Sequence, residues 1–140
     1  MNRDEIKKLL PHREPMLLLD SVERVGDEAR GRYLVRGDEY FLQGHFPGNP
    51  VVPGVILCEI LAQSACVLLQ DSPEAGLTPM YSGIDKVRFR RPVRPGECIE
   101  TCCRRIKRAK HPFYFAEGSA SVKGELCISG DFSFALVKGE

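Results

Sequence analysis

The sequence predicts an α+β fold in which a curled antiparallel sheet of about six strands wraps around one long buried helix. The helix is predicted by the apolar run from Val55 to Leu69, whose polar residues are Glu59, Gln63 and Ser64. Apolar side chains occur on every side of this run, and a helix that is apolar all round is buried all round. The sheet is predicted by strand-like segments that alternate with short turns from residue 80 onward.

The N-terminal part predicts a short helix and two strands. Residues 3–10 place apolar residues on one helical face, and Asn2 and Glu5 stand in the N-cap and N3 positions of a capping box. We expect this helix to end at Pro11, because a proline cannot continue it. Two strands around a Gly-Asp turn are expected next, over residues 16–25 and 28–36.

The chain from residue 37 predicts a functional loop and, after the helix, four strands. The loop over residues 37–54 holds three of the ten prolines, and an ordered loop of such length is usually functional. Short connections predict antiparallel neighbours, and the Lys123-Gly124 pair is typical of a two-residue hairpin. One antiparallel sheet curled around a buried helix is the hotdog fold, which is the fold that we expect. Its last four strands are expected at Met80–Arg90, Glu97–Arg108, Pro112–Val122 and Glu125–Val137.

Length and composition narrow the function classes. We expect residues 1–140 to form one domain, since a chain of this length is most simply a single domain. The 20 Lys and Arg residues nearly balance the 19 Asp and Glu residues, which disfavours nucleic acid and anionic membranes as partners. The apolar run is too short to span a bilayer, which needs about 20 residues. The first residues lack the pattern of a signal peptide, so we expect a cytoplasmic protein.

The cysteines are expected to be free thiols. They do not occur at a C-x-x-C spacing, so no zinc site is expected, and a chain of this size needs no disulfides to fold. A cysteine nucleophile is an open alternative, although most buried cysteines behave as small hydrophobic residues. The six are Cys58, Cys66, Cys98, Cys102, Cys103 and Cys127.

His45 is the first candidate catalytic residue. It lies in the Gly- and Pro-rich stretch Gly44–Gly54, directly before the apolar run. An imidazole titrates near neutral pH, so it can accept a proton with little tuning, and a stiff backbone holds the ring in place. The alternative is a histidine that only hydrogen-bonds a loop carbonyl.

Glu59 is the second candidate, because its neighbours in the run are apolar. A glutamate is rarely buried without a partner, and burial of its ionised form is costly. Burial therefore favours the protonated form, which a general acid needs. Gln63, four residues later on the same helical face, is placed to orient the carboxyl group. The alternative is a glutamate at the helix edge that faces solvent or a subunit interface.

Gly54 opens the predicted helix. The first N–H groups of a helix have no partners within it and lie at the positive end of the helix dipole. A substrate carbonyl beside Gly54 would be polarised there, as in an oxyanion hole. The alternative is a Pro-Gly helix start that binds no ligand.

The remaining histidines, His12 and His111, are expected to be structural, because neither has a catalytic companion nearby in the sequence. The basic residues form two clusters, which are either solvated surface or a receptor for an acidic or phosphorylated partner. Few aromatic residues are interleaved with them, which disfavours single-stranded nucleic acid. The first cluster is Arg88, Arg90, Arg91 and Arg94, and the second is Arg104, Arg105, Lys107, Arg108 and Lys110.

Three segments together resemble the β-hydroxyacyl-acyl carrier protein dehydratases of bacterial type II fatty acid synthesis. They are Gly44–Gly54 followed by Glu59, residues 10–20 and residues 83–96. The resemblance spans nearly the whole chain and includes the spacing from histidine to glutamate. Glu59 and the short chain resemble the short, broad-specificity branch, since the longer dehydratase-isomerases have Asp at that position. The sequence departs from the family pattern at Asn49 and Glu97.

The resemblance implies that a (3R)-3-hydroxyacyl thioester on acyl carrier protein loses water to give the trans-2-enoyl thioester. It implies that His45 takes the C2 proton and that Glu59 helps the C3 hydroxyl leave, directly or through a bound water. Gln63 would orient Glu59, and the Gly54 N–H would polarise the thioester carbonyl. No metal and no cofactor are implied beyond the phosphopantetheine arm that carries the substrate.

The resemblance also implies partners. In relatives the histidine of one subunit meets the glutamate of the next at a dimer interface, and dimers assemble into hexamers as trimers of dimers. Acyl carrier protein would dock on the first basic cluster, and the acyl chain would lie in an apolar tunnel. The expected tunnel residues are Phe46, Ile56 and Phe89.

Two alternatives remain at this point. One is another thioester enzyme on the same fold, either an acyl-CoA thioesterase or an enoyl-CoA hydratase. The other is a non-catalytic acyl-binding subunit, which predicts that the catalytic residues are lost, whereas His45 and Glu59 are both present.

Overall fold

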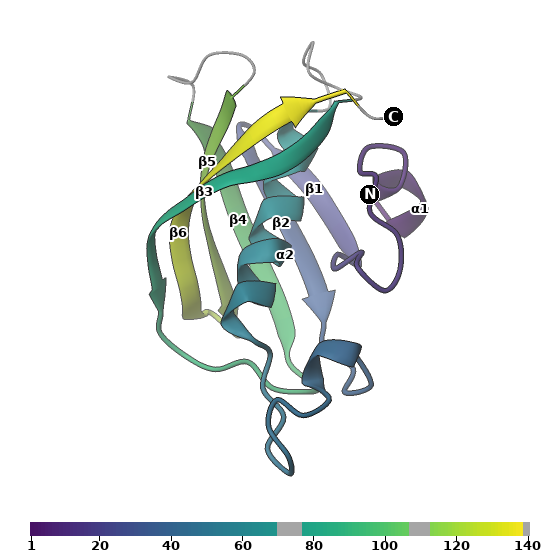
Figure 1. The fold of residues 1–140 in the computed structure, drawn as a ribbon, viewed down its shortest axis with the longest axis vertical. Helices are drawn as coiled ribbons and strands as arrows, with labels where there is room; N and C mark the ends of the chain where they lie inside the picture. The colour runs from purple at the N-terminus through teal and green to yellow at the C-terminus, as the bar shows by residue number, and fades with distance from the viewer. Residues whose placement is uncertain (70–76, 107–112, 139–140) are drawn as a thin grey trace.

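The computed structural model describes residues 1–69, 77–106 and 113–138. Figure 1 shows a curled sheet around one long helix, α2 (Gly54–Cys66), with the short helix α1 (Arg3–Ile6) to one side. Two 3₁₀ turns, η1 (Tyr40–Leu42) and η2 (Val67–Leu69), precede and follow α2. The strands are β1 (Ser21–Val25), β2 (Glu28–Leu34), β3 (Thr78–Phe89), β4 (Cys98–Ile106), β5 (Phe113–Val122) and β6 (Glu125–Val137).

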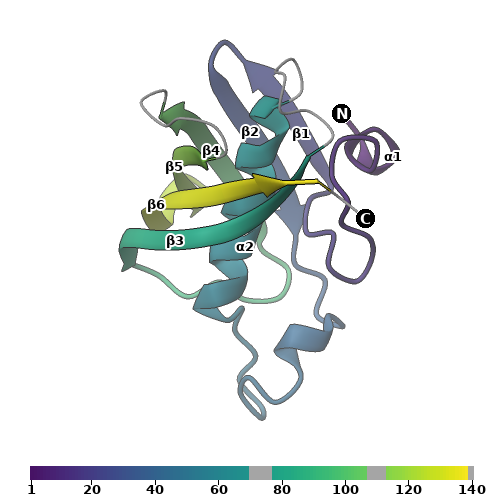
Figure 2. The same cartoon turned by 45° about the horizontal axis from the view of Figure 1, so that its top comes forward.

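The six strands form one antiparallel sheet in the order β1-β2-β4-β5-β6-β3. The two views in Figures 1 and 2 show that the sheet curls so that α2 lies against its inner side. This arrangement confirms the predicted α+β hotdog fold. Strands β1 and β3 are the two edges of the sheet.

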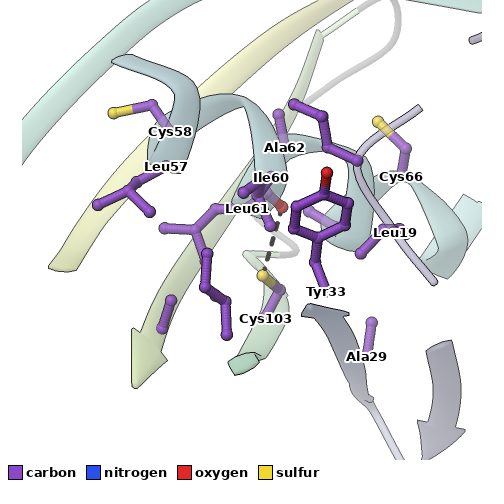
Figure 3. Close-up of a cluster of buried hydrophobic side chains, with 14 of the residues drawn as sticks. Leu19, Ala29, Tyr33, Leu57, Cys58, Ile60, Leu61, Ala62, Cys66 and Cys103 are labelled. Carbon is purple, nitrogen blue, oxygen red and sulfur yellow. Dashed lines mark hydrogen bonds between the residues drawn. The ribbon is translucent and has the colours of Figure 1, made fainter. Parts of the chain in front are cut away.

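Helix α2 is buried, as its composition predicts. After the first turn all of its residues except Glu59 are buried, whereas Val55 in the first turn is 73% exposed. Figure 3 shows α2 side chains such as Leu61 packed in a cluster with Tyr33 of β2. The Cys103 thiol of β4 lies against the Leu61 carbonyl, with Sγ and O 3.4 Å apart. Apolar packing therefore fixes the helix against the centre of the sheet.

Strand β3 pairs with β6 and not with β4, its neighbour in sequence. The short connection predicts that β3 and β4 are adjacent, and this prediction is wrong. The connecting residues 90–97 instead carry the chain from an edge of the sheet to its interior and bond to loops on the way. Val52 N–H donates to the Val93 carbonyl (2.8 Å), and Val35 N–H donates to the Glu97 carbonyl (3.0 Å). The connection thereby anchors the loop that precedes α2.

Residues 16–20 are not part of a strand, since β1 begins only at Ser21. The three leucines at 17–19 are all buried, so they do not alternate between two faces as strand residues do. Their segment starts in a turn, in which the Met16 N–H donates to the Arg13 carbonyl (2.8 Å). Apolar content alone therefore overestimates the length of this strand.

Helix α1 starts at its predicted capping box but is shorter than predicted. The Asn2 side chain accepts the Glu5 N–H (3.0 Å), and the Glu5 side chain accepts the Asn2 N–H (3.3 Å). The α-helix ends at Ile6, and the chain continues in turns up to Leu10. A helix of four residues is stabilised mainly by its cap and by the buried Ile6 side chain.

A buried polar cluster joins α2 to the sheet. Gly31 N–H donates to Thr101 Oγ1 (2.9 Å), and the hydroxyl oxygens of Thr101 and Ser64 lie 2.8 Å apart. A Cβ at position 31 would lie 2.8 Å from Thr101 Oγ1 and 2.9 Å from Ser64 Oγ. The close approach of α2 to β2 therefore requires a glycine here.

We expect Gly31→Ala to lower the free energy of unfolding by about 1–3 kcal/mol, because overpacking a rigid core site forces its neighbours to shift. Chemical denaturation of the two proteins measures the difference. An unchanged midpoint would contradict the close packing of α2 on β2.

Asp20 ties the N-terminal segment to the sheet. Its carboxylate accepts hydrogen bonds from the Leu34 N–H (2.7 Å) and from the guanidinium groups of Arg36 (2.7 Å) and Arg3 (3.0 Å). Burial alone would raise the pKa of Asp20, but these donors outweigh it and hold the pKa below its ordinary value of 3.8. The ionised carboxylate therefore stabilises the folded protein.

We expect Asp20→Asn to lower stability at neutral pH by about 1–2 kcal/mol, because three donors lose a charged acceptor. The folded-state pKa lies below 3.8, so the stabilisation is present above that pH and is lost as the pH falls through the folded-state pKa. Urea denaturation of both proteins at several pH values checks this. A difference in stability that stays constant as the pH falls well below 3.8 would contradict the role of the charge.

Candidate active site

His45 lies in the loop between η1 and α2, where backbone groups hold its ring. Its Nδ1 lies 3.0 Å from the Val51 carbonyl oxygen, and its own carbonyl accepts the Val51 N–H (2.8 Å). A carbonyl oxygen can only accept, so Nδ1 carries the proton of the neutral ring and Nε2 has a lone pair. The ring also stacks on Phe46, with the ring centroids 4.2 Å apart. His45 is thus oriented with Nε2 available to accept a proton.

The loop that carries His45 is anchored to the connection between β3 and β4. The Arg94 guanidinium group donates to the Asn49 side-chain oxygen (2.6 Å). Within the loop, the Phe46 N–H donates to the Asn49 carbonyl (3.0 Å), and the reverse bond closes the turn (2.9 Å). Asn49, a departure from the family pattern, therefore has a defined partner in this chain.

Glu59 projects from α2 with 22% of its side chain exposed. Gln63 Nε2, one helical turn later, donates to Glu59 Oε2 (2.9 Å). The buried Gln63 amide also donates to the Met16 carbonyl (2.7 Å) and accepts the Leu18 N–H (2.9 Å). These partners fix the orientation of the amide, because its oxygen faces a donor and its nitrogen faces acceptors. The amide in turn fixes one oxygen of the Glu59 carboxyl group.

His12 lies beside Glu59, a companion that its sequence neighbours do not reveal. His12 Nε2 is 3.4 Å from Glu59 Oε2. A signal for this contact does exist in the sequence, because polar residues in a buried helix need partners from another segment. Both residues line a cavity of about 40 Å³, together with Ala62, Gln63, Cys66, Pro79, Tyr81 and Phe134.

Gly54 is the first residue of α2, so its N–H has no acceptor within the helix. The ring of Phe89, at the end of β3, packs against it, since a Cβ at position 54 would lie 2.6 Å from Phe89 Cε1. Glycine is therefore the residue that admits the ring in this position. Of the other two expected tunnel residues, Phe46 is exposed and Ile56 is partly buried against the core.

One chain does not bring His45 and Glu59 into contact. Among the described residues, the cavity beside Glu59 is lined by α2, by β3 and β6 and by His12, and not by His45. His45 contacts its own loop instead. In a single chain, the His45 imidazole and the Glu59 carboxyl group therefore lie apart, and we call each of them one half-site of the candidate active site.

Comparison with known proteins shows to which family this chain belongs. A sequence model of the family described as "FabA-like domain" matches residues 10–131. The chain belongs to the FabA-like family. It is 42% identical over 138 residues to a protein of Clostridium perfringens named 3-hydroxyacyl-[acyl-carrier-protein] dehydratase FabZ, with 97% of this chain and 99% of that protein covered. A protein of the same name from Oenococcus oeni is 43% identical over 139 residues, with the same coverage.

A solved structure supports the fold of this FabA-like chain. The dehydratase heterocomplex ApeI:P from Xenorhabdus doucetiae has a chain that superimposes with a TM-score of 0.79 at 23% identity. The match covers 94% of this chain and 90% of the other. At that level of identity the likeness concerns the fold alone.

The first basic cluster of this FabA-like chain is partly used in its own structure. Arg91 pairs with two glutamates, of which Glu97 is the nearer (2.6 Å), and hydrogen bonds from Arg91 lower the pKa of Glu97. Arg94 holds the His45 loop. Arg88 and Arg90 have exposed side chains. Arg91 and Arg94 therefore bond to other parts of the chain, although Arg94 is exposed, as Arg88 and Arg90 are.

The second basic cluster is also engaged where the structure describes it. Arg104 pairs with Glu28 (2.8 Å), and the Arg105 guanidinium carbon lies 4.8 Å from the centre of the Tyr114 ring. The remaining members, Lys107, Arg108 and Lys110, lie outside the described residues, as does His111.

All six cysteines are free thiols, as the sequence predicts. Burial raises the pKa of the Cys66 thiol beside Glu59 to about 12, so it stays protonated near neutral pH and is a poor nucleophile. Residues 1–69, 77–106 and 113–138 contain no cluster of three His, Cys, Asp or Glu side chains placed to hold a metal ion. No helix in these ranges is long and apolar enough to cross a membrane.

Proposed function

We propose that this protein is a 3-hydroxyacyl-[acyl-carrier-protein] dehydratase of fatty acid biosynthesis, with His45 as its base and Glu59 as its acid. The observation that carries the assignment is the identity of 42% and 43% with dehydratases of that name over 97% of the chain. The site supports it, because one half offers an imidazole lone pair and the other a partly buried carboxyl group. We further propose that residues 1–140 form one domain and that the enzyme works in the cytoplasm.

In the proposed reaction, His45 Nε2 removes a proton from C2 of a (3R)-3-hydroxyacyl thioester. The electron pair of that C–H bond forms the C2–C3 double bond as the bond from C3 to the hydroxyl oxygen breaks. Glu59 gives its proton to the departing oxygen, directly or through a bound water, and water leaves. The proton on His45 returns to Glu59 through solvent. These steps need no metal and no redox cofactor, and the phosphopantetheine arm serves only to carry the substrate.

Two further residues assist these steps. The Gly54 N–H would donate to the thioester carbonyl oxygen, which gains negative charge as the C2 proton leaves, and one such donor contributes about 10²- to 10³-fold in kcat. Gln63 would keep the Glu59 carboxyl group oriented through its hydrogen bond to Oε2. Gly54 would act from the start of α2, and Gln63 from a position further along the same helix.

We propose that a second copy of the chain completes each site, so that His45 of one subunit meets Glu59 of the partner subunit. The separation of the two half-sites supports this. A second support is the free edge strand β3, where Met80, Ile84 and Phe89 are 55%, 51% and 58% exposed. A free edge with large apolar side chains is a natural pairing site. Three such dimers would form the hexamer that the resemblance implies.

The acidic acyl carrier protein would dock on the first basic cluster. Arg88 and Arg90 are its most available members, because Arg91 and Arg94 are held by partners in their own chain. Exposed charges of this kind mainly speed the encounter of two proteins. The acyl chain would enter an apolar tunnel bordered by Phe46, Ile56 and Phe89.

The test is to incubate the protein with a 3-hydroxyacyl thioester of acyl carrier protein and to record enoyl absorbance and free thiol together. A dehydratase raises the absorbance and leaves the thioester intact. Thiol release without enoyl absorbance would reject this function in favour of a thioesterase. In a parallel assay, hydration of an enoyl-CoA without turnover of the carrier-protein thioester would favour a hydratase. No turnover of any of these thioesters would favour a non-catalytic subunit.

A further inference from the structure

The two oxygens of the Glu59 carboxyl group have different surroundings. Oε2 accepts a hydrogen bond from Gln63 Nε2 (2.9 Å) and lies 3.4 Å from His12 Nε2. Oε1 has no hydrogen-bond partner among the described residues. The described protein groups therefore contact Oε2, and Oε1 is available to substrate or water.

The surroundings of Nδ1, the second ring nitrogen of His12, indicate which tautomer of the ring lies beside Glu59. Nδ1 is buried, and no partner reaches it within the described part of the chain. A proton on Nδ1 would bury an unpaired donor, which is costly. It would also turn the Nε2 lone pair toward Oε2, which already accepts the Gln63 N–H. A charged ring would likewise place an unpaired N–H at Nδ1. The neutral ring with its proton on Nε2 fits the site, because it buries no unpaired donor at Nδ1 and keeps an N–H on Nε2, which lies 3.4 Å from Glu59 Oε2.

We propose that His12 is a positioning residue for the catalytic acid. Gln63 donates to Oε2 of Glu59, and His12 Nε2 lies close enough to add a second N–H to that oxygen when the site closes, so the acidic proton resides on Oε1, the oxygen left for the substrate. The separation of 3.4 Å is longer than a good hydrogen bond, and catalytic hydrogen bonds often tighten only when substrate closes the site. This inference rests on the proposed function, since it assigns the proton of the general acid to one atom.

The chain holds His12 in place from several directions. The guanidinium group of Arg13 donates to the carbonyls of His12 (2.7 Å) and Leu10 (3.0 Å). Arg3 pairs with Glu14 (3.1 Å) on the same segment. These contacts fix the backbone on both sides of His12, so the ring can orient a carboxyl group and does not merely follow it.

Two variants separate a positioning role from a structural one. His12→Gln keeps an N–H donor at the reach of Nε2, whereas His12→Leu has none. In dehydration of a 3-hydroxyacyl thioester of carrier protein, we expect His12→Leu to lower kcat about 10- to 100-fold with little change in KM, because a misplaced acid slows the chemical step. We expect His12→Gln to stay within about threefold of wild type. Lys8→Ala, an exposed residue earlier in the same N-terminal segment, is the control and should leave kcat unchanged.

A double-mutant cycle shows whether His12 acts through Glu59. In a Glu59→Gln background, His12→Leu should lower kcat no further, because the group that it positions is already gone. NMR of the imidazole nitrogens of the wild-type protein adds a readout that needs no activity, with a proton expected on Nε2 and none on Nδ1.

Several results would overturn this role. They are an additive loss in the Glu59→Gln background, equal losses in the Gln and Leu variants at position 12, or an NMR proton on Nδ1. If the wild type dehydrates its substrate and His12→Leu is equally fast, the positioning role fails and the proposed function stands. A wild type that dehydrates no 3-hydroxyacyl thioester rejects both.

Discussion

Replacing His45 with Ala or Glu59 with Gln is expected to lower kcat by about 10²- to 10⁴-fold, which is the usual contribution of a positioned base or acid. His45→Ala removes the Nε2 lone pair that would accept the C2 proton. Glu59→Gln keeps the shape of the side chain but has no acidic proton to give to the leaving hydroxyl. Steady-state kinetics on a 3-hydroxyacyl thioester of carrier protein measures both losses.

The control for these variants is a change in the same loop that touches neither group. Gln43 is exposed and lies two residues before His45, so Gln43→Ala should keep the wild-type rate. Circular dichroism should show all of these variants to be folded, because His45 and Glu59 both lie partly exposed. A folded His45→Ala or Glu59→Gln enzyme with a rate near that of wild type would remove that residue from the mechanism.

Mixing the two inactive variants is expected to restore activity. Each mixed dimer combines the intact His45 of the Glu59→Gln subunit with the intact Glu59 of the His45→Ala subunit, which rebuilds one of its two sites. Equal amounts that are unfolded and refolded together should therefore regain about a quarter of the wild-type activity, since half of the dimers are mixed. The assay is the same dehydration reaction, with each variant refolded alone as the control.

A mixture no more active than the separate variants, although mass spectrometry detects mixed dimers, would contradict the shared site. It would mean that His45 and Glu59 of one chain act together. The half-sites of this structure would then have to close within the single chain, which would require the loop after η1 to move against α2.

Local features of the fold follow from short stretches of sequence. Lys123 and Gly124 both have positive φ (51° and 79°), as a two-residue hairpin turn requires, and β6 has the predicted bounds Glu125–Val137. Helix α2 begins at Gly54, where the Pro-Gly pair precedes the apolar run. In each case the neighbouring residues alone restrict the backbone strongly enough for its local structure to be predicted.

Contacts between distant segments could not be predicted in this way. Nothing local marks β6 as the partner of β3, because every strand offers the same backbone groups to its neighbours. The bond between Leu18 and Gln63 joins residues 45 positions apart, and the approach of His12 to Glu59 depends on it, because it brings the segment after α1 onto α2. The candidate residues could be chosen by type and spacing, but which of them meet is decided by this long-range packing.

Hydration of a trans-2-enoyl thioester of acyl carrier protein in heavy water tests the central claim most directly, with the product examined by NMR and mass spectrometry. The account predicts an intact thioester with a hydroxyl group at C3 and one deuterium at C2 for the wild type, and neither change at a comparable rate for His45→Ala. Release of the free acid and thiol by the wild type, or deuterium at C2 at the wild-type rate in His45→Ala, would contradict it.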